Sequence, residues 1–349
     1  MSVQNYKCPG CGAPIAFNPK TGGFKCEYCF SEYTEEAITA QVQQYAAQKE
    51  PAHEDDAGGH DSMKTYECGN CGAEVVAGDT STAAFCYYCH SPVVLSDRLK
   101  GSFKPDSIIP FKITKKEAIR KFLNWAGDKF FIPKDFTSDL QQEKITGMYL
   151  PYWQADVKAQ VDFHAVGRTV TEWESGNEIY TKTDTYRIDR KGTVDVNNLQ
   201  KLAFLKIDEN LINGISPYNE EDMKNFSEGY LAGFFAERYT EGKENMEPTF
   251  LKKAEEYTAS TIYDSCACDS LDKEENNTRY AITQFRQLLL PTWILTYLYN
   301  GKTYVFAVNG QTGKACGELP FNKTKAALFS VGLGVLTSVL ALLGGFFIW

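Results

Sequence analysis

The chain has 349 residues, of which 43% are apolar and 13% aromatic. This is enough to fill the cores of two or three domains, so the chain is not a disordered tether. Its 36 Lys and Arg residues against 45 Asp and Glu residues give a net charge of −9, which argues against a protein that holds nucleic acid through clustered positive charge.

The first ninety residues contain two copies of one cysteine pattern, in which two Cys-x-x-Cys pairs are separated by 14 residues. Two such pairs converge tetrahedrally on one Zn²⁺, and four thiolates leave no open position for catalysis. The pattern predicts two structural zinc ribbons, at residues 1–33 and 64–98, and thus two Zn²⁺ per chain. The predicted ligands are Cys8, Cys11, Cys26 and Cys29 in the first ribbon, and Cys68, Cys71, Cys86 and Cys89 in the second.

Disulfides and iron are the alternatives for these eight cysteines. Disulfides need an oxidising compartment, but the N-terminus has no apolar signal-peptide core. Ligand type alone does not separate zinc from iron. The Gly-Ala dipeptide after Cys11 recurs after Cys71, which favours a duplicated module. A ribbon of this size buries too little apolar surface to fold alone, so we expect the metal to fold it.

Residues 34–63 are predicted to link the ribbons. Ser31 or Thr34 is a candidate cap for a short helix that ends near Lys49, after which the chain is too polar and acidic to pack. Two histidines in this acidic stretch, His53 and His60, lack further ligands at a suitable spacing, so we expect them to be solvated.

Residues 99–322 are predicted to form a body of mixed helices and antiparallel strands, which makes the whole chain an α+β protein. Thr114 and Glu117 form a capping box before a helix whose Ala118, Phe122 and Trp125 share one face. Residues 153–196 alternate between apolar and polar, as antiparallel strands do.

A second helical region is expected after Pro217 and Asn219, with a core-facing stripe of Tyr230, Leu231, Phe234, Phe235 and Arg238. Strand character returns after Ile282. The dipeptides Asn300-Gly301 and Asn309-Gly310 then predict two turns.

The tetrapeptide Leu150-Pro151-Tyr152-Trp153 has an echo in Leu290-Pro291-Thr292-Trp293. We hypothesise that the body contains two related halves about a pseudo-twofold axis. Each proline would start its strand, and each tryptophan would anchor the core.

Residues 326–349 contain no charge and span about 36 Å as a helix, against roughly 30 Å for the hydrocarbon core of a bilayer. They are predicted to be a single-pass, C-terminal anchor in the cell membrane. Lys314, Lys323 and Lys325 precede the segment, so the preceding residues should lie in the cytoplasm. Four small residues lie along one face, where another helix could approach closely, and we hypothesise that the segment forms homo- or hetero-oligomers there: Gly334, Ser338, Ala341 and Gly345.

Catalytic motifs such as Gly-x-Ser-x-Gly, His-Glu-x-x-His and Gly-x-Gly-x-x-Gly are missing from the sequence, which predicts that the protein is not an enzyme. Cys266 and Cys268, with Cys316 elsewhere in the sequence, are candidates for a redox role or for a third metal site. Free thiols are favoured, because no cation adjoins the pair and its neighbours are acidic.

The paired ribbons, the segment Tyr149–Trp153, the hairpin after Leu290 and the terminal apolar helix together resemble a bacterial family of zinc-ribbon membrane proteins. Its members often carry TFIIB-type zinc-binding or primosomal-helicase-like labels. The resemblance implies a membrane-stress setting beside an SPFH-domain protein and a PspA-type protein. The helicase label is poorly supported here, because the chain has no Walker motif.

The expected function is a membrane-anchored scaffold or adaptor that recruits cytoplasmic proteins, such as an SPFH-domain protein, during membrane stress. The alternative is a nucleic-acid-binding zinc-ribbon factor of transcription or replication that is tethered to the membrane. DNA binding that falls steeply with salt would favour the alternative. The acidic composition predicts no such binding.

Overall fold

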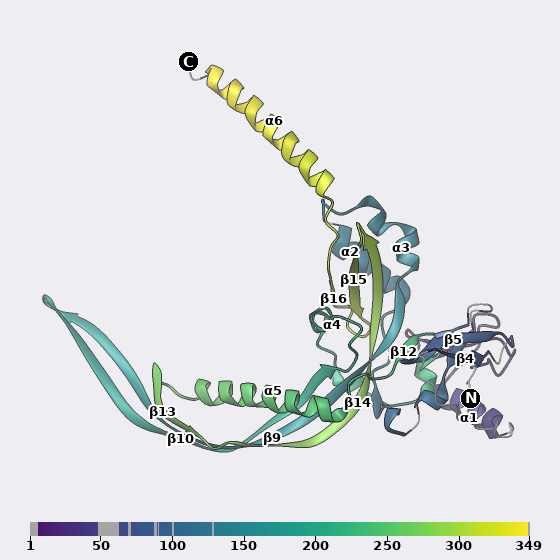
Figure 1. Cartoon of the computed structure of the whole chain (residues 1–349), viewed down its shortest axis with the longest axis horizontal. Helices are drawn as coiled ribbons and strands as arrows, with labels where there is room; N and C mark the ends of the chain where they lie inside the picture. Colours follow the sequence, from purple (N-terminus) through teal and green to yellow (C-terminus); the bar gives the residue numbers. More distant parts are fainter. Residues whose placement is uncertain are drawn as a thin grey trace.

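One large sheet connects most of the molecule in the computed structural model, which describes residues 6–47, 63–68, 71–86, 89, 91–99, 101–127 and 129–347. This sheet has 11 strands, and its main path runs β11-β8-β14-β9-β12-β6-β7. Two small N-terminal sheets lie at one end, and helix α6 projects from the body (Figure 1). The fold is α+β, as the sequence predicts.

The first cysteine module contains three short strands and a helix. Its elements are β1 (Ala16–Asn18), β2 (Gly23–Lys25), β3 (Glu32–Tyr33) and α1 (Glu35–Ala47). The backbone N–H of Ala37 donates to Thr34 Oγ1 over 3.4 Å, so Thr34 rather than Ser31 caps the helix. The predicted extension to Lys49, the polar linker, His53 and His60 lie outside the described residues.

The second cysteine module is joined to the large sheet through two of its four strands. Its elements are β4 (Met63–Glu67), β5 (Glu74–Gly78), β6 (Ser81–Phe85) and β7 (Pro92–Val94). β4 pairs with β5 alone, whereas β6 pairs with both β7 and the body strand β12 (Phe235–Glu237). The second module therefore shares backbone hydrogen bonds with the body.

The body consists of two units with the same βαββ order. The first unit contains β8 (Ser107–Ile108), α2 (Lys115–Gly127), β9 (Thr146–Ser175) and β10 (Glu178–Leu202). The second contains β12, α5 (Lys243–Asp264), β14 (Arg279–Tyr299) and β15 (Lys302–Asn309). The remaining elements are α3 (Asp139–Glu143), α4 (Glu209–Ile215), β11 (Lys224–Asn225), β13 (Ser270–Asn276), β16 (Ala315–Gly317) and α6 (Lys323–Phe347).

The two units exchange their first strands. β9 and β14 pair antiparallel at the centre, where Leu150 lies opposite Leu290. β8 of the first unit pairs in parallel with β14 of the second, and β12 of the second pairs in parallel with β9 of the first. The two similar tetrapeptides therefore lie opposite each other on neighbouring strands. The parallel pairing of β8 with β14 on one side of them is repeated by the parallel pairing of β12 with β9 on the other.

The two tryptophans occupy equivalent places in this arrangement. Trp153 Nε1 donates to the carbonyl of Glu241 over 2.7 Å, and its ring lies 5.2 Å from that of Tyr239. Trp293 Nε1 donates to the carbonyl of Ile113 over 2.9 Å, and its ring lies 5.1 Å from that of Phe111. Both tryptophans are almost fully buried, since only 6% of Trp153 and 5% of Trp293 is exposed.

The expectation that each proline starts its strand is wrong, because Pro151 and Pro291 both lie inside long strands. The Pro151 carbonyl accepts from Ala203 N–H over 2.9 Å, and the Pro291 carbonyl accepts from Gly310 N–H over 2.8 Å. The N–H and C=O of one strand residue point to the same side, so the nitrogen of Pro151 faces the end of β10 and the nitrogen of Pro291 faces the end of β15. Each ladder has already ended at that position, and the missing N–H of proline therefore costs no ladder hydrogen bond.

The helices α2 and α5 bury the same pattern of positions. α2 begins at the predicted capping box, in which Thr114 N–H donates to Glu117 Oε2 over 2.8 Å, so that prediction is confirmed. The buried side chains recur every four residues in each helix, as one face of a helix requires. They are Ala118, Phe122 and Ala126 in α2, and Met246, Phe250, Ala254, Thr258 and Ile262 in the longer α5.

Phe122→Ala and Phe250→Ala should each lower the free energy of unfolding by about 3–5 kcal/mol, because each ring is fully buried and leaves a cavity. Chemical denaturation of the full chain in detergent measures the loss. The exposed substitution Lys252→Ala is the control and should change stability by less than about 0.5 kcal/mol. A small loss for only one of the two phenylalanines would contradict their equivalence.

The predicted helix after Pro217 is wrong. This stretch forms short 3₁₀ turns, at Glu220–Asp222 and Glu228–Leu231, and then β12. Gly233 has a φ of +94°, and a Cβ there would lie 2.7 Å from Ala16 Cβ. The apolar residues from Tyr230 to Phe234 are buried because they pack under the first cysteine module. The long helix of this region is α5, which begins only at Lys243.

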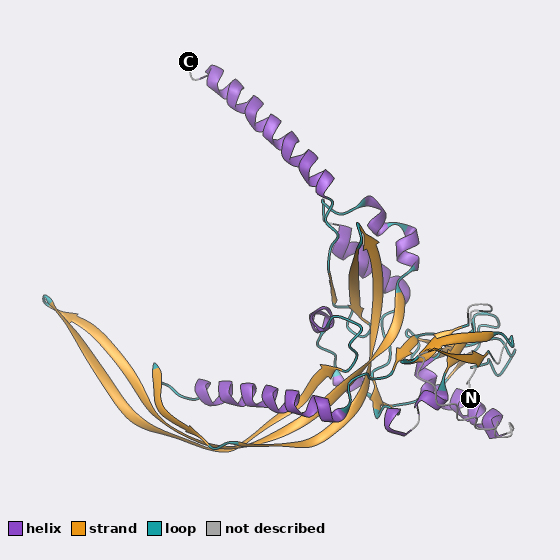
Figure 2. Ribbon diagram, viewed as in Figure 1, coloured by secondary structure: helices purple, strands orange, loops and turns teal. Residues whose placement is uncertain are grey.

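Both predicted turns near the C-terminus are confirmed. Asn300 and Gly301 have φ values of +50° and +77° between β14 and β15, as a two-residue hairpin requires. After Asn309 the chain reverses, so that Ala315 pairs with Val308. The strands expected within residues 153–196 form a long curved hairpin of β9 and β10, which extends far from the body (Figure 2).

Helix α6 is long and apolar enough to cross a membrane, over Lys323–Ala341, and none of that stretch is buried against the protein. In a core helix, one face would be covered by the protein. Among the residues with described side chains, the small residues Gly334, Ser338 and Ala341 are likewise exposed. Gly345 lies beyond them.

Candidate metal centres

The first cysteine pair is presented by a tight turn of the backbone. Cys8 N–H donates to the Ala13 carbonyl over 2.7 Å, and Gly12 N–H donates to the Cys8 carbonyl over 2.8 Å. Gly12 has a φ of +73°, which only glycine adopts without strain. The second module repeats the turn: Gly72 N–H donates to the Cys68 carbonyl over 2.7 Å.

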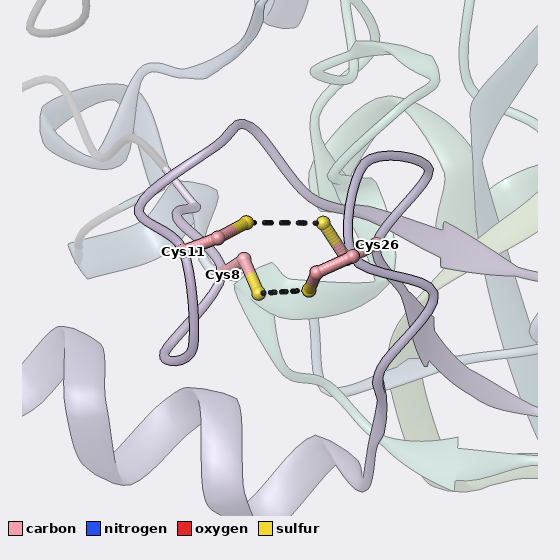
Figure 3. Close-up of side chains that lie close together, drawn as sticks. Cys8, Cys11 and Cys26 are labelled. Atoms are coloured by element: carbon pink, nitrogen blue, oxygen red, sulfur yellow. Dashed lines mark hydrogen bonds between the residues drawn. The ribbon is translucent and has the colours of Figure 1, made fainter.

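The four sulfurs of the first module converge on one point (Figure 3). Cys8 Sγ lies 3.5 Å from Cys29 Sγ, and Cys11 Sγ lies 3.6 Å from Cys26 Sγ. All four lie within 4.8 Å of one another. Sulfurs bonded to Zn²⁺ at about 2.3 Å in a tetrahedron are about 3.8 Å apart, whereas a disulfide requires about 2.05 Å. The cluster fits a tetrahedral metal ion.

The second module forms an equivalent cluster. Cys68 Sγ lies 3.7 Å from Cys89 Sγ, and Cys71 Sγ lies 3.7 Å from Cys86 Sγ. In each cluster the first and third cysteines are fully buried, whereas the second is exposed. The structure thus brings together all eight cysteines in the two sets that the spacing predicts.

A serine hydroxyl lies beside one sulfur of each cluster, which the sequence analysis missed. Ser31 Oγ lies 3.3 Å from Cys29 Sγ, and Ser91 Oγ lies 3.2 Å from Cys89 Sγ. The Ser31 hydroxyl and backbone N–H lower the pKa of the Cys29 thiol to about 6, which favours the thiolate that binds metal. The shared spacing Cys-x-Ser after each second pair was the available signal.

The first module is packed firmly onto the body. Phe17 N–H donates to the Ala232 carbonyl over 3.0 Å, and the Phe17 ring lies 5.3 Å from that of Tyr230. Phe24 is fully buried, and a Cβ on Gly229 would approach its ring to 3.1 Å. Both cysteine modules are therefore joined to the body, one by side-chain packing and the other by the shared sheet.

The other three cysteines do not form a third cluster among the residues that the structure describes. Cys266 is buried near the end of α5, where its Sγ lies 3.2 Å from the Ile262 carbonyl. Cys316 lies on β16 against Gly214, in a different part of the body.

Gly12→Ala should weaken metal binding by the first module about tenfold, because a left-handed non-glycine residue costs about 1–2 kcal/mol. No atom lies within 4 Å of the added Cβ, so the effect isolates backbone strain. Competition with a zinc chelator measures the affinity. Gly12→Asn is the matched control and should lose less, since Asn tolerates this conformation better. Equal affinity in the Ala variant and the parent would contradict the strain.

Comparison with known proteins places the chain beside a bacterial relative. No protein-family model matches it, and no solved structure matches it. The uncharacterized protein YdjG of Bacillus subtilis (strain 168) is 31% identical over 332 residues, which cover 95% of this chain and 94% of YdjG. An alignment of that extent covers nearly the whole of both chains. The chain therefore belongs to the same family as YdjG.

Proposed function

We propose that this protein is a membrane-anchored zinc-ribbon scaffold that binds cytoplasmic protein partners at the cell membrane. The observation that carries the proposal is the presence of two tetracysteine clusters and one exposed apolar helix on a single connected body. The clusters stabilise the head, and the helix determines where the head is held.

Zinc is the metal that we assign to both clusters, on the ribbon spacing and the donor set of four sulfurs. Four thiolates complete a tetrahedral shell, so the ion has no position left for a substrate and its role is structural. We accordingly propose no enzymatic activity for the chain.

The exposed apolar face of α6 supports insertion in the membrane, and the preceding lysines Lys314, Lys323 and Lys325 support a cytoplasmic head. That side of the membrane also keeps thiols reduced, as metal binding by cysteine requires. The net charge of −9 gives no support to a role on nucleic acid.

The outer turn of the first module offers a surface for a partner. Tyr28 and Phe30 flank the ligand Cys29 and are 73% and 72% exposed. Aromatic side chains are enriched at the centres of protein interfaces, because each buries a large area at a low entropic cost. The resemblance of the chain to membrane-stress zinc-ribbon proteins suggests an SPFH-domain protein as the partner, with a PspA-type protein in the same setting.

Affinity purification of the full chain from bacterial membranes in mild detergent tests the proposal. We expect an SPFH-domain protein to co-purify, and Tyr28→Ser with Phe30→Asn to abolish its recovery while two Zn²⁺ per chain remain. Asn suits position 30, where φ is +59°. Tyr257→Ser removes a 61% exposed aromatic ring from α5 and is the control. Unchanged recovery after cysteine-to-serine changes in both modules would refute the docking role.

A further inference from the structure

The loop between α2 and α3 lies against the base of α6 (Figure 1). Asn322 N–H donates to the Phe131 carbonyl over 2.7 Å, and Lys325 Nζ donates to the Ile132 carbonyl over 2.7 Å. The Phe329 ring of α6 lies 5.4 Å from that of Phe130 and 5.6 Å from that of Phe131. We name residues 129–134 the Phe130 loop.

These contacts hold the Phe130 loop beside the first two turns of α6. Phe329 is six residues beyond Lys323, where α6 begins, which is about 9 Å along the axis. The uncharged stretch begins at Ala326. A bilayer that takes in this stretch contains Phe329, and the ring of Phe130 lies at the same level beside it.

The surface of the loop has the chemistry of a membrane interface. Phe130 is 67% exposed and Phe329 48% exposed, and Phe321, whose ring lies 5.8 Å from that of Phe131, is 53% exposed. Large aromatic side chains that gather on a protein surface mark a site of contact with another apolar phase. Three lysines close in sequence to these phenylalanines are exposed, and their charges suit anionic lipid headgroups: Lys129, Lys134 and Lys323.

We propose that the Phe130 loop inserts into the lipid interface beside α6 and gives the protein a second contact with the membrane. This inference rests on the proposed anchoring by α6. The loop follows α2 directly, and α2 packs on β15 through the ring of Phe122, which lies 5.0 Å from that of Phe306. The second contact therefore restricts rotation of the whole head about the helix.

Photocrosslinking in lipid vesicles tests the insertion. The full chain, with p-benzoylphenylalanine in place of Phe130, is reconstituted into vesicles of phosphatidylethanolamine and phosphatidylglycerol and irradiated. Mass spectrometry then detects lipid adducts. The same residue in place of Leu333 reports on α6, and in place of Tyr257 it reports on an exposed position of α5. We expect adducts at 130 in a yield similar to that at 333, and none at 257.

The possible results separate the loop from the anchor. Adducts at 333 with none at 130, nor at 131 in a further variant, overturn insertion of the loop and leave the anchor intact. A lack of adducts at 333 refutes the anchor itself. If the yield of adducts at position 257 equals that at position 130, the probe labels lipid at any exposed position. That result also overturns the proposal.

Discussion

Cys26→Ser should reduce the zinc content from two ions per chain to one and unfold the first cysteine module. Cys26 is fully buried, and its Sγ is one of four that meet within 4.8 Å. Structural Zn²⁺ contributes about 10–16 kcal/mol of apparent binding free energy at pH 7, as much as the whole stability of a typical domain. The apolar core of a module this small is too limited to replace that contribution. Elemental analysis of the purified chain measures the loss.

The same variant should also loosen the body beneath the module. Phe17 and Phe24 cover Tyr230 and Gly229, so unfolding of the module exposes residues 228–234. Their amide hydrogen exchange should become faster, while exchange in β14 stays slow. Cys268→Ser removes a cysteine outside the clusters and should keep two ions and the parent's exchange pattern. Two ions in the Cys26 variant would contradict the assignment of this ligand.

The cysteine clusters could be predicted from sequence because their geometry is local. Each Cys-x-x-Cys turn needs only a few neighbouring residues, such as Gly12 with its positive φ, and the metal's preference for a tetrahedron relates the two turns. The hairpin at Asn300 and the capping box at Thr114 are local in the same sense. Chemistry within a few residues dictated each of them.

What the sequence did not reveal depends on contacts between distant segments. The apolar stripe after Pro217 has a helix-like spacing, but Gly233 lies against Ala16 of the first module, and that packing gives turns and a strand instead. The place of Pro151 inside β9 likewise depends on where β10 ends. No pattern within either segment records its partner.

The likeness between the two body units was almost invisible in sequence for a related reason. Ala118 of α2 corresponds in place to Met246 of α5, so burial is shared where identity is not. The phenylalanines Phe122 and Phe250 keep both residue type and burial, and both are among the largest fully buried side chains of the protein. Packing constrains volume and polarity more strongly than it constrains the identity of a residue.

Leu336→Lys combined with Leu340→Lys should move the protein from the membrane fraction to the soluble fraction. Both positions are near the middle of α6 and are exposed, by 55% and 58%, so each lysine would lie in hydrocarbon without a protein partner. Each substitution costs about 3 kcal/mol of insertion free energy, and the pair about 6 kcal/mol, which is roughly four decades in partition.

Carbonate extraction of membranes, followed by zinc analysis of both fractions, measures this result. Leu336→Ala with Leu340→Ala changes the same positions but keeps the segment apolar, so that variant should stay in the pellet. The lysine variant should still carry two Zn²⁺ per chain, since the clusters are built on the N-terminal modules and not on α6. If the lysine variant resists carbonate as the parent does, α6 is not what holds the protein to the bilayer, and the exposed apolar face must be covered by another protein.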